Sequence, residues 1–258
     1  MGKGKITSSE RQTISISTRV INLISRASSD EIARHGLLMV FLAVLSGFLM
    51  YLYQLAMGKL LSPQDFGILF SLTSILSIVT ISAQALSATV SRFTSKMRAE
   101  GKTDSLGYLW RLFLRRAVVT GIIVFSLFVL LSPVISEFLH IHKVSYVVIL
   151  FSSTTILFVF VANQGMLNGL QMFSQLGVSV ALESFLVFVL AGVLANLGLG
   201  IYSALIAFPI SYIAVAILSF YFLRHLRTAR SEPTSVTGSG VYASYTLLSV
   251  LMFTAITN

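Results

Sequence analysis

Long apolar stretches, nearly free of charge, constrain this 258-residue chain more than any other feature of its sequence. An α-helix rises about 1.5 Å per residue, so about 20 apolar residues cross the 30 Å hydrocarbon core of a bilayer. With 55% hydrophobic and only 10% charged residues, the chain is unlike an ordinary soluble domain. We therefore predict an all-α integral membrane protein whose six transmembrane helices cover residues 36–58, 66–91, 117–136, 144–162, 173–196 and 201–223.

The remaining segments divide the chain into four parts. Residues 1–34 form a polar, basic tail with a short interfacial helix, and residues 35–223 form the six-helix lobe. Residues 224–240 are predicted to be a linker. A seventh apolar stretch, 241–258, is still running where the sequence stops, so we expect the truncated start of a seventh helix.

Two turns are predicted within the lobe. The polar run Asn163–Gln171, which includes Gly165-Met-Leu-Asn-Gly169, is interpreted as a break between the fourth and fifth helices. Gly165 and Gly169 also match the spacing of small residues that pack helices closely, but the polar setting favours a turn. Gly198-Leu-Gly200 predicts a tight turn before the sixth helix.

The positive charges predict the orientation. If the tail is cytoplasmic, sixteen of the eighteen Lys and Arg residues lie on the inner side, and only Lys59 and Lys143 lie outside. Cytoplasmic loops of membrane proteins carry an excess of Lys and Arg, which is known as the positive-inside rule. The rule favours a multi-pass protein of the cell membrane with a cytoplasmic N-terminus. The net charge of +9 then needs no nucleic acid as a partner, and no recognition motif accompanies it.

Few residues offer covalent chemistry. The chain has no cysteine, which excludes disulfides, thiolate metal sites and cysteine nucleophiles. No phosphate-binding loop, nucleophile elbow or paired-carboxylate site is present, and His140 and His142 lack a third metal ligand in sequence. We therefore predict a protein that is not an enzyme and that has no cofactor and no metal site.

Glu183 is the one acidic residue inside a predicted span, roughly 15 Å along the fifth helix and thus near the bilayer midplane. A carboxylate there must face protein or water rather than lipid. Gln175 and Ser179 precede it at helical spacing and predict a polar face. Glu183 is either a substrate contact or ion-coupling site, or else the partner of a group on a neighbouring helix.

The second span carries a continuous polar stripe at steps of three and four residues. It predicts the wall of a hydrophilic cavity, with close helix packing as the alternative. The size of Gln84 and the basic inner end favour the cavity. The members of the stripe are Thr73, Ser77, Thr80, Gln84, Ser87, Ser91, Thr94 and Arg98.

Several motifs resemble those of oligosaccharide flippases, the polysaccharide biosynthesis proteins of the multidrug/oligosaccharidyl-lipid/polysaccharide exporter superfamily. Leu60-Leu-Ser-Pro-Gln-Asp-Phe-Gly67 is similar to the turn between the first two helices of that family. Ala88-Thr-Val-Ser-Arg-Phe93, the run 165–173 and the basic linker after helix six fit the same pattern. The family often carries Arg or Lys in the turn after helix four, whereas this chain carries Asn163, Gln164, Asn168 and Gln171 there.

The resemblance implies one six-helix lobe of a two-lobed transporter, with a missing C-terminal lobe as its partner. It implies translocation of a polyprenyl pyrophosphate-linked oligosaccharide by alternating access. The alternatives are a cation-coupled small-molecule or drug exporter of the same superfamily, and a non-transporting scaffold or inactive truncated product. The candidate cavity residues are Gln84, Ser87, Ser91, Arg92, Lys96, Arg115 and Glu183, with Glu183 also the candidate for ion coupling.

The basic residues near the inner mouth have two interpretations. Arg92, Lys96, Arg111, Arg115 and Arg116 could hold the pyrophosphate of the substrate. They could instead be topological anchors that bind the headgroups of anionic membrane lipids, which the positive-inside rule favours for most of them.

The predicted orientation can be tested with a single cysteine, because the chain has none of its own. A cysteine at Thr103, in the loop between the second and third helices, should resist a membrane-impermeant maleimide added to intact cells. A cysteine at Lys143 should react under the same conditions and serves as the positive control. Labelling at Thr103 from outside would contradict the orientation.

Overall fold

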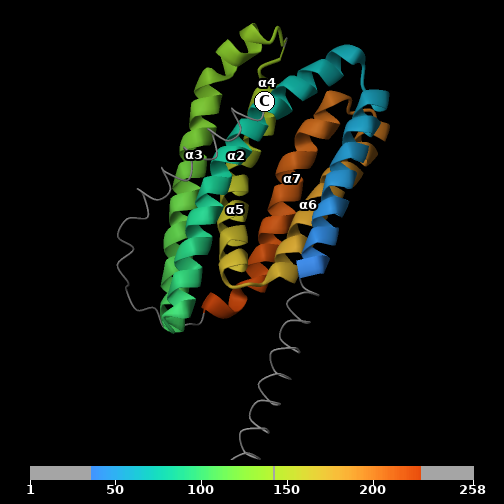
Figure 1. The fold of residues 1–258 in the computed structure, drawn as a ribbon. Coiled ribbons are helices and arrows are strands. Elements are labelled where there is room, and N and C mark those ends of the chain that lie inside the picture. Colours follow the sequence, from blue (N-terminus) through green and yellow to red (C-terminus); the bar gives the residue numbers. More distant parts are fainter. Residues whose placement is uncertain (1–35, 142, 228–258) are drawn as a thin grey trace, which may run out of the picture.

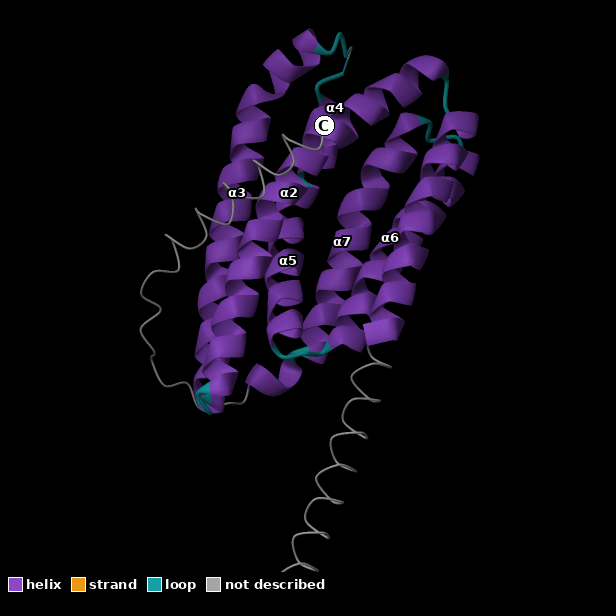
Figure 2. Ribbon diagram, in the orientation of Figure 1, coloured by secondary structure: helices purple, strands orange, loops and turns teal. Residues whose placement is uncertain are grey.

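A computed structural model describes residues 36–141 and 143–227, and every regular element in this part of the chain is helical (Figures 1 and 2). The first helix, Gly36–Leu60, and five further stretches are long and apolar enough to cross a membrane, which confirms the six predicted spans. The elements that follow the first helix are α2 (Pro63–Ala99), α3 (Leu106–Phe138), α4 (Ser145–Phe151), α5 (Ser153–Gly169), α6 (Phe173–Asn196) and α7 (Ile201–Phe222).

The helices α2 and α3 extend well beyond their predicted apolar spans, and the start of α2 is capped by a side chain outside the apolar region. Ser62 caps α2: its side-chain oxygen accepts a hydrogen bond of 3.1 Å from the backbone N–H of Asp65, and Pro63 occupies the first helical position. At its other end α2 continues through Lys96 and Arg98 in its last turn. Cations there are favourable at the negative end of the helix dipole.

The fourth span is bent where α4 gives way to α5. Ser152, Ser153 and Thr154 each donate a side-chain hydrogen bond to the backbone carbonyl three residues earlier. Such bonds compete with the regular helical ladder and bend a helix locally. Together α4 and α5 still form one crossing, Ser145–Gly169.

The predicted polar break after the fourth span is wrong in its position. The helix α5 continues through Asn163 and Gln164 to Gly169, and the turn is confined to residues 170–172, with Gln171 at φ 60°. Asn163 is fully buried, and its Oδ1 accepts a hydrogen bond of 2.9 Å from Nε1 of Trp110 on α3. A buried amide with such a partner is compatible with a membrane helix, so the run of polar residues did not end it.

Gly165 and Gly169 are helix-packing residues rather than parts of a turn. A Cβ atom on Gly165 would lie 2.6 Å from the carbonyl oxygen of Ser87, and one on Gly169 would lie 2.5 Å from Cβ of Thr94. Glycine at these two positions therefore lets the backbones of α2 and α5 come together, as small residues do in membrane helix pairs. The packing alternative to the turn holds for this motif.

The helix α5 is the central element, packed against α2, α3 and α7, while α6 packs along α7. The first helix lies beside α6 (Figure 1). There a hydrogen bond of 2.5 Å joins the hydroxyls of Ser46 and Ser184, and Gly177 packs against Leu42. The predicted turn between α6 and α7 is confirmed: Gly198 and Gly200 have φ of 84° and 54°, values that glycine adopts without strain.

Two predicted segments lie outside the described residues, namely the interfacial helix of the tail and the seventh apolar stretch. The same holds for the linker beyond residue 227, and its first residues, Arg224–Arg227, form a short 3₁₀ helix.

The glycine contact predicts a stability difference between two identical substitutions. Gly165→Ala would place a methyl group against the α2 backbone, so it should lower the free energy of unfolding by about 1–3 kcal/mol, as overpacking does. Gly192→Ala is the matched control, because nothing lies within 4 Å of a Cβ there. That helical alanine should be neutral or stabilising by up to about 1 kcal/mol. Thermal melts in one detergent measure both, and equal effects would contradict the packing assignment.

Candidate functional site

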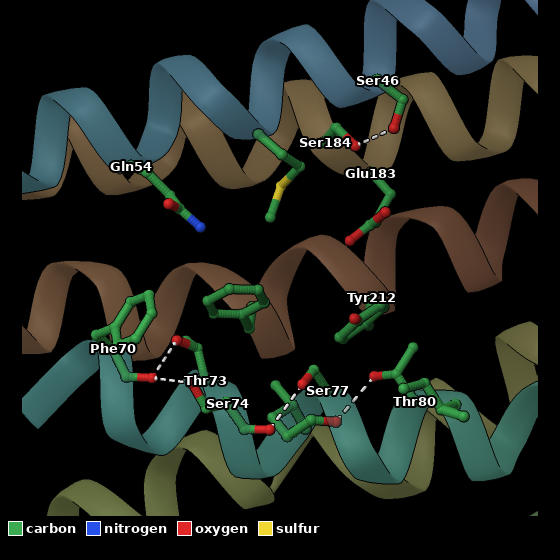
Figure 3. Close-up of a pocket in the computed structure, with 14 residues that line it drawn as sticks. Ser46, Gln54, Phe70, Thr73, Ser74, Ser77, Thr80, Glu183, Ser184 and Tyr212 are labelled. Atoms are coloured by element: carbon green, nitrogen blue, oxygen red, sulfur yellow. Dashed lines mark hydrogen bonds between the residues drawn. The ribbon is translucent and has the colours of Figure 1, made fainter. Parts of the chain in front are cut away.

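Two adjoining cavities lie inside the bundle, and the first helix, α2, α6 and α7 contribute residues to both. We call the end with the turn at residues 61–62 the outer end and the end with the turn at 170–172 the inner end, following the predicted orientation. The outer cavity, of about 470 Å³, is shown in Figure 3. Its polar lining residues are Ser46, Gln54, Thr73, Ser74, Ser77, Thr80, Glu183, Ser184 and Tyr212.

The inner cavity has a volume of about 370 Å³ and adds α5 to its walls. Its polar lining residues are Thr80, Gln84, Ser87, Gln164, Asn168, Glu183 and Tyr212. Thr80, Glu183 and Tyr212 line both cavities, so they form a waist where the two meet. The carboxylate of Glu183 projects from α6 towards α7 and α2 at this level (Figure 3).

Glu183 meets no cation in the part of the chain that the structure describes. No Lys, Arg or His among the described residues lines either cavity, and no ion pair joins Glu183 to them. A carboxylate halfway along a membrane helix is unfavourable unless water, a ligand or a counter-charge reaches it. Within these residues, the predicted alternative of a cationic partner on a neighbouring helix finds no support.

The hydroxyl groups of α2 that line the outer cavity are already engaged as donors. Thr73, Ser77 and Thr80 donate to backbone carbonyls of α2 at 2.8, 2.7 and 3.0 Å. This is the usual way for Ser and Thr to satisfy their donors in an apolar helix. What these side chains present to the outer cavity is therefore mainly the lone pairs of their oxygens, which accept hydrogen bonds or face cations.

The polar face predicted for the fifth span is only partly present. Ser179 is fully buried and donates to the carbonyl of Gln175 at 2.8 Å, and neither residue lines the cavities. The positions of α6 that face the inner cavity are Leu176, Val180 and Glu183. Glu183 thus enters the cavity from a largely apolar face.

The structure brings some of the predicted site residues together. Gln84, Ser87 and Glu183 line the inner cavity, and Thr73, Ser77 and Thr80 of the same stripe line the outer one. From Ser91 onward the stripe turns into helix packing, since the backbone of Ser91 and the side chain of Thr94 contact α5 at Gly169. Both interpretations of the stripe therefore hold, each for a different part of α2.

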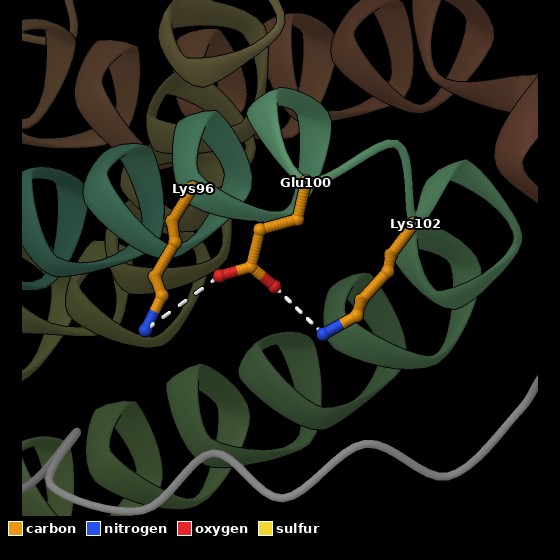
Figure 4. A network of polar contacts seen from close by, with 3 residues as sticks. All are labelled: Lys96, Glu100 and Lys102. Atoms are coloured by element: carbon orange, nitrogen blue, oxygen red, sulfur yellow. Dashed lines mark hydrogen bonds and ion pairs between the residues drawn. The ribbon is translucent and has the colours of Figure 1, made fainter.

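The basic residues at the inner end of α2 engage other groups. Arg98 donates a hydrogen bond to the carbonyl of Leu170, which caps the C-terminus of α5. Lys96 and Lys102 flank Glu100 at 3.9 and 2.7 Å (Figure 4). The hydrogen bond and the positive charge of Lys102 lower the pKa of Glu100 below its ordinary value.

The structure does not bring the remaining cations to the cavities. Arg115 lies on α3, where it lines a separate depression with Arg116, Val119 and Thr120. Arg92 is exposed near the inner end of α2 and lines neither cavity. These positions suit the topological interpretation of the cations better than direct contact with a ligand held near Glu183.

Two lining residues on α5 were missed by sequence reasoning. Gln164 and Asn168 line the inner cavity, although the sequence suggested a turn there. A helical pattern in the sequence could have identified them. The residues of α5 that line this cavity recur at helical spacing, namely Leu157, Phe160, Val161, Gln164 and Asn168. Gln54 and Tyr212 also line these cavities and were not anticipated, because neither belongs to a continuous polar stripe in the sequence.

Similar folds occur among membrane transporters. A MOP superfamily transporter from Pyrococcus furiosus Vc1, described as having a binding pocket of reverse polarity, aligns with a TM-score of 0.73 and 14% identity, over 85% of this chain and 52% of its own. An outward-facing multidrug resistance MATE family transporter of the same superfamily aligns with a TM-score of 0.70 and 17% identity, over 85% of this chain and 52% of its own. MATE in complex with Br-NRF aligns with a TM-score of 0.68 and 18% identity, over 87% of this chain and 55% of its own.

The structural comparisons identify the fold of this chain, and the sequence comparison identifies its family. The fold is thus that of one lobe of a MOP superfamily transporter, and the chain spans about half the length of these structures. Residues 32–256 match the family described as polysaccharide biosynthesis protein, so this chain belongs to the polysaccharide biosynthesis protein family. No curated protein sequence matched the chain.

The cavity assignment predicts different reactivity at two neighbouring exposed positions of α2. Ser77 lines the outer cavity, whereas Ile78 is 58% exposed but lines neither cavity. A thiol reacts as the thiolate, which requires water. Ser77→Cys should therefore react with a small methanethiosulfonate at least about tenfold faster than Ile78→Cys in membranes. Equal rates, measured by mass spectrometry, would contradict a hydrated cavity.

Proposed function

We propose that this chain is one lobe of a transporter that moves a polyprenyl-linked oligosaccharide across the cytoplasmic membrane, with its N-terminus in the cytoplasm. The observation that carries the proposal is a polar cavity with a central carboxylate inside an apolar bundle of the polysaccharide biosynthesis family. A glycan needs such a hydrated compartment, since its hydroxyl groups cannot enter hydrocarbon without hydrogen-bond partners. The lipid tail can remain in the bilayer.

In this proposal Glu183 couples transport to a cation. It lies at the waist, where both cavities reach it, and the oxygens of Thr73, Ser77 and Thr80 line the approach from the outer cavity. Binding of a proton or sodium ion at Glu183 would neutralise the one charge in the cavities and bias the lobe towards one of its states. A ligand shifts such an equilibrium only through its different affinity for the two states.

A second function is supported by the same carboxylate. A cation-coupled exporter of small cationic molecules would also need an acid in an otherwise uncharged cavity, and MATE transporters share this fold. Among the described residues, this lobe contributes a single acid to its cavities, which provides little attraction beyond that needed for the coupling ion. The two functions therefore differ in substrate rather than in the role of Glu183.

The test uses the intact protein in proteoliposomes that carry a polyprenyl pyrophosphate-linked oligosaccharide. Translocation is read as the glycan becoming accessible to an impermeant lectin, with and without an imposed proton or sodium gradient. Gradient-dependent movement of the glycan supports the proposal. Movement of an organic cation with no movement of the glycan lipid supports the exporter instead, and movement of neither supports a scaffold.

Glu183→Gln tests the coupling role in the same assay. The substitution keeps size and hydrogen bonding but removes the charge, so we expect the gradient to lose its effect and the rate to fall at least about tenfold. The melting temperature should stay within about 2 °C of wild type, since no described cation loses a partner. Glu100→Gln, at the exposed inner end, is the control and should leave transport unchanged. A stable Glu183→Gln protein with full gradient-driven transport would remove Glu183 from the mechanism.

A further inference from the structure

Three carboxamide side chains converge on the inner cavity. Gln84 comes from α2, and Gln164 and Asn168 come from α5, where a spacing of four residues places them one turn apart on one face. In the described part of the chain none of the three carboxamides has a hydrogen-bond partner. This contrasts with the α2 hydroxyls of the outer cavity, whose donors are bonded to their own helix.

Unpaired carboxamides define the kind of ligand that would suit this cavity. Each carboxamide offers two N–H donors and one carbonyl acceptor and carries no charge. Hydroxyl and acetamido groups have the same dual character, so they can exchange hydrogen bonds in both directions with such side chains. A phosphate would need cations, yet no described Lys or Arg lines the inner cavity. An organic cation would be drawn to Glu183 at the waist rather than to the amides.

The remaining wall of the inner cavity is apolar and aromatic. The rings of Phe160 and Tyr212 lie with their centroids 6.3 Å apart and their planes at 44° to each other, and both residues line the cavity. A sugar ring has an apolar face of C–H groups, which packs favourably on the negative face of an aromatic ring. The volume of about 370 Å³ lies near the lower end of the range for small-molecule pockets, about 300–1,000 Å³. This size suits one or two sugar residues.

We propose that the inner cavity is a binding site for an uncharged sugar residue, held by the carboxamides of Gln84, Gln164 and Asn168 against Phe160 and Tyr212. The inference rests on the proposed function and makes it more specific, because it assigns the glycan to a site within this lobe and predicts selection for neutral sugars. Glu183 is then left to the coupling ion, at the edge of the sugar site.

The test measures binding of three soluble probes to the intact protein by ligand-observed NMR titration. The probes are methyl glucoside, methyl N-acetylglucosaminide and glucuronate. We expect the two neutral probes to bind saturably and glucuronate, whose negative charge meets no described Lys or Arg in the cavity, to bind at least about tenfold more weakly. Gln84→Leu and Asn168→Leu should each weaken binding of the neutral probes about three- to tenfold, the usual effect of losing a hydrogen bond between uncharged groups.

Gln54→Leu is the matched control for both variants. Gln54 is exposed and lines the outer cavity but not the inner one, so the same change there should leave sugar affinity unaltered. Neutral sugars that bind Gln84→Leu and Asn168→Leu as tightly as wild type would overturn the site, as would stronger binding of glucuronate than of the neutral probes.

The translocation assay separates failure of this inference from failure of the proposed function. Glycan-lipid transport that persists at the wild-type rate in Gln84→Leu and Asn168→Leu would refute the sugar site while leaving the flippase proposal intact. Saturable, Gln84-dependent binding of methyl glucoside without any glycan-lipid transport would sustain the sugar site and refute the flippase.

Discussion

The close approach of α5 to α2 at Gly165 and Gly169 determines much of what this lobe can contain. Because neither residue has a side chain, the two backbones meet, and α5 becomes a wall of the cavity that α2 also lines. Gln164 and Asn168 directly precede the two glycines and line the inner cavity together with Gln84. Packing in a membrane relies on such contacts, since hydrocarbon tails are as apolar as the side chains they replace.

The two cavities differ in the hydrogen bonds that they leave available. In the outer cavity the Ser and Thr side chains of α2 use their donors within that helix, so they present acceptor oxygens beside Gln54, Tyr212 and Glu183. In the inner cavity the carboxamides keep both donors and acceptors free among the described residues. The single carboxylate stands at the boundary between them. We interpret this difference as two separate sites, with Glu183 for the coupling ion and the carboxamides of the inner cavity for the glycan.

Much of the fold could be predicted from the sequence, because a bilayer permits few solutions. Any spanning segment must satisfy its own backbone hydrogen bonds, so long apolar runs identify helices directly. The turn at Gly198 and Gly200 was equally predictable, since glycine adopts positive φ without strain. The end of α5 could not be predicted from the sequence. The hydrogen-bond partner of Asn163 within this helix is Trp110, which lies 53 residues away in the chain.

The candidate site was predictable only in part, for the same reason. Helical periodicity singled out Gln84, Ser87 and Glu183 as candidates, and all three line one cavity. Periodicity alone does not reveal which part of a polar stripe meets a neighbouring helix. The change from cavity wall to helix packing near Ser91 therefore could not be predicted from the sequence. The distance of Arg115 from the cavities likewise follows from the position of α3 against α5, a tertiary contact.

The most direct measurement of the central claim is a cryo-EM structure of the intact protein with a polyprenyl pyrophosphate-linked oligosaccharide bound. The account predicts density for sugar residues inside the lobe, between α2 and α5, within hydrogen-bond distance of Gln84 and Asn168. Glycan density confined to the outside of the lobe, such as the depression beside Arg115 on α3, with the inner cavity empty, would contradict it.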